Sequence, residues 1–248
     1  MLTLMGVAGC VEESRTYSQE LEAEVLEYLN DSYSVDFVVG RIVPASNAFT
    51  GLTYDVVTVH AADDPDYQFE VHRRASESGE HVFTDGFALA LAEQQIESEV
   101  QPAWSGWNDA RVAVRFKTAT GVVEGYQPTG GLDMAQLGDA VGAEGMVLVW
   151  VFAEADSSNN LESDAADVAS RMTKTLTDAS SMGARWGIAV YYLSEQSLRE
   201  LNPRDFASMD YLDVGRLSGA QASVIIESAT LGGGSTVTES DVVKVLGK

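Results

Sequence analysis

Three histidines, His60, His72 and His81, are the side chains best suited to metal or acid–base chemistry. His60 and His72 fall on stretches predicted to form neighbouring strands, and an acidic turn holding Asp63, Asp64 and Asp66 lies between them. A metal site could be assembled from these groups, but zinc ligands usually follow defined spacings such as HExxH or HxH, and neither occurs here. We therefore interpret these histidines as surface strand residues beside an acidic turn and expect no metal.

Two further stretches have the composition of an ion or phosphate site. The run from Asp156 to Asp164 lacks the glycine and the spacing of a calcium loop, and acidic residues are common where a helix begins. The loop Gly232 to Gly234 precedes a helix, but no lysine follows it as in a phosphate-binding loop. We expect a loop there, capped by Thr238, and no cofactor. The oxygen-bearing residues of the first run are Asp156, Asn159, Asn160, Glu162 and Asp164.

The strongest candidates for ligand contact are Trp104 and Trp107, which stand in a connection rich in proline, glycine and serine. Aromatic rings there could form a ligand platform together with Tyr17, Tyr28 and Tyr33. The alternative is that both indoles fill the edge of a core. No G-x-S-x-G elbow is present for nucleophilic catalysis, so the sequence favours a protein without enzymatic activity.

The only cysteine, Cys10, follows an apolar stretch that ends in small residues. The quartet Val7-Ala8-Gly9-Cys10 resembles the lipobox of bacterial lipoproteins. This resemblance implies a diacylglyceryl group on the Cys10 thiol, peptidase cleavage just before it, and anchoring by acyl chains such as palmitate. Two chains give stable attachment, because each buried methylene contributes about 0.8 kcal/mol. The sequence departs from the family in lacking a basic region before the apolar run, and the alternative is a buried strand over residues 1–10.

Composition restricts the class of partner. The net charge is -23, from 38 acidic and 15 basic residues, which argues against nucleic acid because its phosphates would be repelled. No stretch approaches the roughly 20 apolar residues that a membrane-spanning helix needs. A single cysteine excludes an intramolecular disulfide and a cysteine-rich zinc site.

The candidate residues must be positioned by regular elements, which apolar periodicity predicts. In the first half, a helix begins at a Thr16–Gln19 capping box, and a second helix begins after Thr84 and ends at Pro102. The helices cover 17–30 and 85–100, and the strands cover 35–43, 52–60, 67–74 and 111–116.

The segment Gly121 to Gly131 is rich in glycine and threonine and is the predicted domain boundary. After it, two strands that are apolar along their whole length flank a helix, which predicts a parallel or mixed sheet. The expected strands are 146–153, 187–193 and 222–228, and the expected helices are 133–141, 162–180, 195–202 and 238–246. We predict an α+β protein of mixed sheets packed with helices, with a signal remnant and tether over 1–16 and two small domains over 17–120 and 121–248.

The order of elements in the first half resembles that of small bacterial lipoproteins of unknown function. Together with Cys10, it predicts a lipid-anchored protein on the extracytoplasmic face of the cell membrane that binds a protein or small molecule without catalysis. A ligand-capturing lipoprotein serving a transporter is the alternative, and a deep aromatic pocket between two lobes would favour it. An envelope hydrolase is a third interpretation, which a histidine held by a carboxylate in a cleft would favour.

Overall fold

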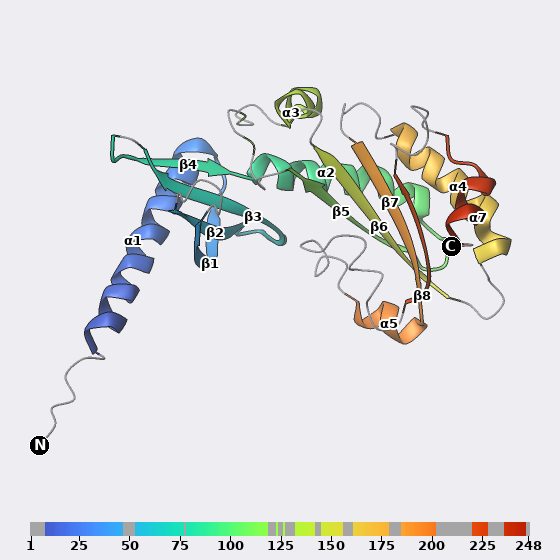
Figure 1. The fold of residues 1–248 in the computed structure, drawn as a ribbon, viewed down its shortest axis with the longest axis horizontal. Coiled ribbons are helices and arrows are strands. Elements are labelled where there is room, and N and C mark those ends of the chain that lie inside the picture. Colours follow the sequence, from blue (N-terminus) through green and yellow to red (C-terminus); the bar gives the residue numbers. More distant parts are fainter. Residues whose placement is uncertain are drawn as a thin grey trace, which may run out of the picture. The chain divides into compact units, whose positions relative to one another are not determined.

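A computed structural model describes residues 8–46, 53–76, 78–118, 123, 126, 132–141, 145–155, 161–178, 185–201, 220–227 and 236–246. The chain forms two compact units (Figure 1). Unit 1 comprises Met1–Ala90 and Gly121–Gly131, and unit 2 comprises Leu91–Thr120 and Leu132–Lys248. Each unit holds a four-stranded sheet with helices, which confirms the predicted α+β class.

The division of the chain differs from the predicted one. The first unit ends at Ala90, inside a helix, and strand Arg111–Lys117 pairs in the second sheet. The segment Gly121–Gly131 is not the boundary but belongs to unit 1, where the Val123 amide donates to the Asp85 carbonyl at 3.3 Å. No glycine or proline interrupts residues 87–101, so the sequence carries no local sign that the chain leaves unit 1 there.

Unit 1 is a helix packed on an antiparallel meander with strand order β1-β2-β3-β4. One face of α1 carries a stripe at every fourth position, in which Leu21, Val25 and Leu29 are fully buried. The elements are α1 Ala8–Ser32, β1 Phe37–Ser46, β2 Thr53–Ala61, β3 Asp64–Ala75 and β4 His81–Asp85.

Three local expectations in unit 1 are wrong. Helix α1 begins at Ala8, so Thr16 lies inside it and the stretch expected to be a tether is helical. Residues 10–16 contain no glycine or proline, and helix propagates easily from a turn that is already formed. Thr84 lies in β4, and the Asp85 carboxylate instead accepts the Phe87 amide at the start of the next helix.

Helix α2, Phe87–Trp104, begins in unit 1 and continues in unit 2. It contains Pro102, which was expected to end it, and it extends two residues further to the fully buried Trp104. No helix among the described residues is both long and apolar enough to span a membrane.

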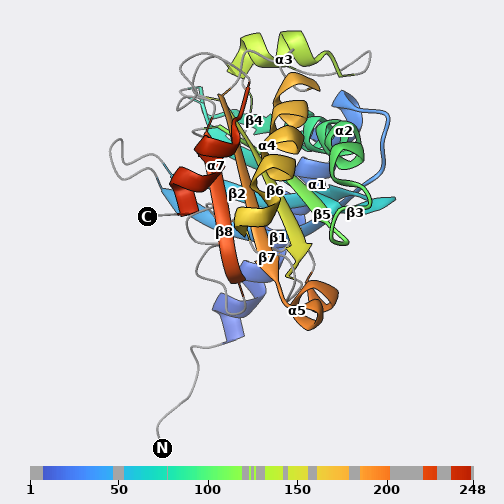
Figure 2. The same ribbon diagram turned by 90° about the vertical axis from the view of Figure 1, so that its right-hand side faces the viewer.

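Unit 2 contains the mixed sheet that the sequence predicts. Its strand order is β5-β6-β7-β8, with β6 and β7 parallel and the outer pairs antiparallel. Figure 2 shows α7 beside α4. Thr238 caps α7 as predicted, since its hydroxyl accepts the Asp241 amide at 3.3 Å. The elements are β5 Arg111–Lys117, α3 Met134–Val141, β6 Met146–Glu154, α4 Leu161–Asp178, β7 Arg185–Leu193, α5 Glu195–Glu200, β8 Ala220–Glu227 and α7 Glu239–Leu246.

Candidate functional site

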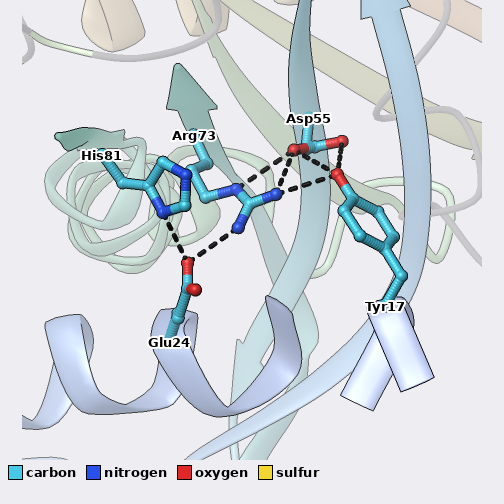
Figure 3. Close-up of polar contacts among 5 residues, drawn as sticks. All are labelled: Tyr17, Glu24, Asp55, Arg73 and His81. Carbon is cyan, nitrogen blue, oxygen red and sulfur yellow. Dashed lines mark hydrogen bonds and ion pairs between the residues drawn. The ribbon is translucent and has the colours of Figure 1, made fainter. Parts of the chain in front are cut away.

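A polar cluster of five residues lies between α1 and the sheet of unit 1 (Figure 3). We call it the Arg73 network, and it consists of Tyr17, Glu24, Asp55, Arg73 and His81. The Arg73 side chain is only 9% exposed, so its charge depends on protein partners. Its Nη1 donates to Glu24 at 2.7 Å, its Nη2 donates to Asp55 at 2.9 Å, and its Nε donates to Asp55 at 3.1 Å.

Tyr17 and His81 complete the network from its two sides (Figure 3). The Tyr17 hydroxyl accepts a hydrogen bond from Arg73 Nη2 at 2.8 Å and lies 2.8 Å from each oxygen of Asp55, to which it donates. The Arg73 guanidinium also lies over the Tyr17 ring, 5.4 Å from its centroid. On the other side, His81 Nδ1 lies 3.0 Å from the Glu24 oxygen that Arg73 binds.

Strand register explains how these residues meet. Asp55 on β2 and Arg73 on β3 are directly paired, and His81 on β4 pairs with Ala75. Alternation along each strand places Asp55 on the same face as Val57 and Val59, and Arg73 on the same face as Phe69 and Val71. Each strand therefore carries one charged residue, Asp55 or Arg73, on the mostly apolar face that is turned toward α1. The charged positions in this alternation are visible in the sequence, but the pairing of Asp55 with Arg73 is not.

Hydrogen bonds and ion pairs within the network stabilise the charged forms of Glu24 and Arg73. Burial opposes ionisation of Glu24, but the hydrogen bonds and charge of Arg73, aided by His81, lower the pKa of Glu24 below its ordinary value. Burial also opposes the charge on Arg73, but Glu24 and Asp55 outweigh it and raise the pKa of Arg73. Partial burial and the neighbouring Asp55 carboxylate raise the pKa of Tyr17. The network thus keeps Tyr17 neutral and Glu24 ionised.

The polar groups of the Arg73 network suit a structural role. All three guanidinium nitrogens of Arg73 are engaged by residues of the network itself. The His81–Glu24 couple resembles the histidine–carboxylate pair of a hydrolase, but the Glu24 oxygen is shared with Arg73, which makes it a weak proton acceptor. The network therefore serves to hold α1 on the strands.

A second polar centre in unit 1 surrounds the buried carboxylate of Asp85, which is 6% exposed as a residue. The hydroxyl of Tyr28 donates to Oδ2 at 2.6 Å, and the hydroxyl of Tyr33 lies 3.0 Å from Oδ1 and 3.1 Å from Oδ2. The Phe87 amide donates to Oδ1 at 2.9 Å. Burial, followed by the charge of Asp85, raises the pKa of Tyr33 far above its ordinary value. We call this set the Asp85 centre.

Trp104 and Trp107 do not form an exposed platform. They are 0% and 7% exposed, and their ring centroids lie 5.3 Å apart. The Trp104 indole N–H donates to Thr175 at 3.1 Å, and Arg171 lies 5.5 Å from the centroid of Trp107. The ligand-platform interpretation is wrong, because these indoles fill the core of unit 2, which was the alternative. Tyr17, Tyr28 and Tyr33 belong to unit 1, in the two clusters described above.

The structure describes only some of the other predicted sites. His60 and His72 do lie on neighbouring strands, but His72 pairs with Val56 and bonds Glu70 at 3.0 Å, whereas His60 pairs with Gln68. Within the described ranges, no group of three or more His, Cys, Asp or Glu side chains is arranged to hold a metal ion. The glycine loop 232–234 and residues 156–160 lie outside the described residues, and Asp164 lies 3.4 Å from the Tyr192 hydroxyl.

Cys10 lies within α1, next to Ala8 and Gly9. Its backbone is helical, and its side chain lies outside what the structure describes, as does Val7. The predicted lipidation is therefore neither supported nor opposed by any contact of the thiol.

Comparison with known proteins supports the fold. Neither protein-family models nor curated protein sequences give a match. Among solved structures, the chain is similar to a DUF5037 family protein from Ruminococcus gnavus, with a TM-score of 0.55 and 16% identity. The similarity covers 84% of this chain and 90% of that one. At this identity the likeness shows a shared fold alone.

Proposed function

We propose that this chain is a lipid-anchored extracytoplasmic protein that binds a partner at the cell surface without catalysis. The observation that carries the proposal is the continuity of α1, which contains both the lipobox-like Cys10 and the buried stripe that begins at Leu21. A lipid on Cys10 would therefore be joined to the core of unit 1 by a helix.

The geometry of α1 suits this role. Cys10 precedes Tyr17 by seven residues, a helical rise of about 10 Å. The first turns of α1 project beyond the sheet of unit 1 (Figure 1). Cleavage before Cys10 would leave Glu12 and Glu13 in the first turn, where the helix dipole favours acidic residues. The docked part of the helix already supplies the nucleus that a short exposed helix lacks.

Binding is favoured over catalysis by how the polar side chains of unit 1 are used. The Arg73 network and the Asp85 centre are built from groups that bond one another and hold α1 and α2 in place. In both clusters the acids, the guanidinium and the phenols have structural partners. The partner of the whole protein is then a protein or small molecule met at the cell surface.

The proposal is tested in the source cell with the gene at its own locus. The wild-type protein is expected in the membrane fraction, accessible to protease added to whole cells, with an N-terminal peptide whose mass shows a diacylglyceryl group on Cys10. Cys10→Ala should abolish the modification and release the protein from membranes. Ser14→Ala, on the same helix, is the matched control and should behave as wild type.

Two outcomes would overturn the proposal. One is a wild-type protein whose Cys10 thiol is free to react with an alkylating reagent. The other is unchanged membrane association of the Cys10→Ala protein.

A further inference from the structure

The Asp85 centre joins two helices through one carboxylate. Tyr28 lies in the last turns of α1 and Tyr33 directly follows its last residue, Ser32, whereas Phe87 is the first residue of α2. The two tyrosine hydroxyls and the Phe87 amide meet at the same two oxygens, at 2.6 to 3.1 Å. Because Asp85 is buried, its carboxylate oxygens depend on these three donors for hydrogen bonds that water would otherwise supply. Loss of the two tyrosine hydroxyls should therefore weaken the hydrogen bond between the Asp85 carboxylate and the Phe87 amide at the start of α2.

Aromatic packing reinforces the connection. The Tyr33 ring lies 4.7 Å from the Phe87 ring, and both rings contact Phe37 at centroid distances of 6.1 and 5.1 Å. Tyr28 stacks on Phe83 at 5.0 Å, two residues before Asp85. Tyr28 thus contacts the strand that carries Asp85, and Tyr33 contacts the helix that follows it. Docking of α1 and ordering of the first turn of α2 use the same contacts.

We propose that Asp85 is a coupling residue that makes the first turn of α2 depend on the docking of α1. The first amides of a helix have no partner within the helix, so a cap supplies one. Asp85 provides that cap while its carboxylate is held by Tyr28 and Tyr33. When α1 lifts from the strands, the carboxylate loses both phenols, turns toward water and releases the Phe87 amide. Undocking of α1 therefore loosens the first turn of α2, the helix that continues from unit 1 into unit 2.

Amide hydrogen exchange of the full chain tests this coupling. The variant Tyr28→Phe/Tyr33→Phe keeps both rings and removes both hydroxyls. We expect exchange of the Phe87 amide to accelerate about tenfold, the usual effect of losing a helix cap. Exchange at the buried strand residues Val57 and Val71, which reports global unfolding, should change much less. The single variant Tyr28→Phe should give a smaller acceleration at the same amide if the double variant folds poorly.

Tyr17→Phe is the matched control, because it removes a phenol that also bonds an aspartate but belongs to the Arg73 network. It should accelerate exchange near Tyr17 and leave the Phe87 amide unchanged. The coupling is refuted if the Phe87 amide exchanges at the wild-type rate in the double variant. It is equally refuted if Phe87, Val57 and Val71 accelerate together, or if Tyr17→Phe affects Phe87 as strongly as the double variant does.

Discussion

Tyr17 in α1 and Tyr33, which directly follows the last residue of α1, stand at the two ends of one stripe, and the hydroxyl of each contacts an aspartate carried by the strands. Tyr17, which is 45% exposed, meets Asp55 at the exposed end of the stripe. Tyr33, 7% exposed, meets Asp85 at the buried end. Between them the stripe is apolar, so hydrophobic burial supplies most of the attachment and the two Tyr–Asp contacts fix its register.

The difference in burial predicts unequal costs for the same chemical change. Tyr33→Phe should lower the free energy of unfolding by about 1–2 kcal/mol, because it takes a donor from a buried carboxylate. Tyr17→Phe should cost less than about 1 kcal/mol, because water can replace an exposed hydroxyl. Urea denaturation followed by circular dichroism measures both values. Equal costs, or a larger cost for Tyr17→Phe, would show that the two ends of the stripe are not distinguished by burial.

Removing the charge at the centre of the Arg73 network should be severe. Arg73→Met leaves Asp55 and Glu24 without their cation, and because the Glu24 side chain is 38% exposed we expect a cost of about 1–3 kcal/mol. Arg73→Lys should recover only part of this loss, because one ammonium cannot copy a guanidinium that bonds two carboxylates and a phenol. The exposed neighbour Arg74 is the control, and Arg74→Met should change stability by no more than about 0.5 kcal/mol. Thermal and urea unfolding of the three variants would decide the matter, and similar values for Arg73→Met and Arg74→Met would contradict the assignment.

The local elements were largely predictable, because each depends on short-range periodicity. The strand at Met146–Glu154, for example, is apolar throughout and lies where the sequence predicts it. β4 was missed, since five residues beginning with a histidine and ending with an aspartate show no strand alternation. The Arg73 network was missed for a different reason. Its members are brought together by strand register and by helix docking, and neither can be computed from local pattern.

The start of α1 and the fate of the tryptophans show the same limit. Composition around Glu12 resembled a tether, but good helix formers continue a helix that tertiary contacts have already nucleated. Trp107 stands in a short connection, and only the fold reveals that Tyr192 and Arg171 enclose it. In both cases the deciding contacts are distant in sequence.

The acid dependence of stability should report Glu24. Because its pKa is lower in the folded protein than its ordinary value, Glu24 contributes stability that is present above the unfolded pKa and is lost as the pH falls through the folded one. The free energy of unfolding of the wild type should therefore fall more steeply between neutral pH and acid than that of Glu24→Gln. Urea denaturation at a series of pH values measures the two slopes. Parallel curves would mean that Arg73 does not stabilise the Glu24 carboxylate.

The environment of tryptophan offers a test that is independent of unit 1. All four tryptophans are described, and none is more than 7% exposed. Native fluorescence should therefore be blue-shifted and resist quenching by iodide, and both properties should disappear in urea. Thr175→Val keeps the shape of the side chain but removes the acceptor of the Trp104 indole N–H, which leaves a buried donor unpaired. This change should cost about 1–3 kcal/mol. Thr173→Val on the same helix is an unsuitable control, because Thr173 also bonds the backbone of Val237, so Ser170→Ala at an exposed position serves instead. Strong iodide quenching of the native protein would show that Trp107 is exposed and would support its interpretation as part of a ligand platform.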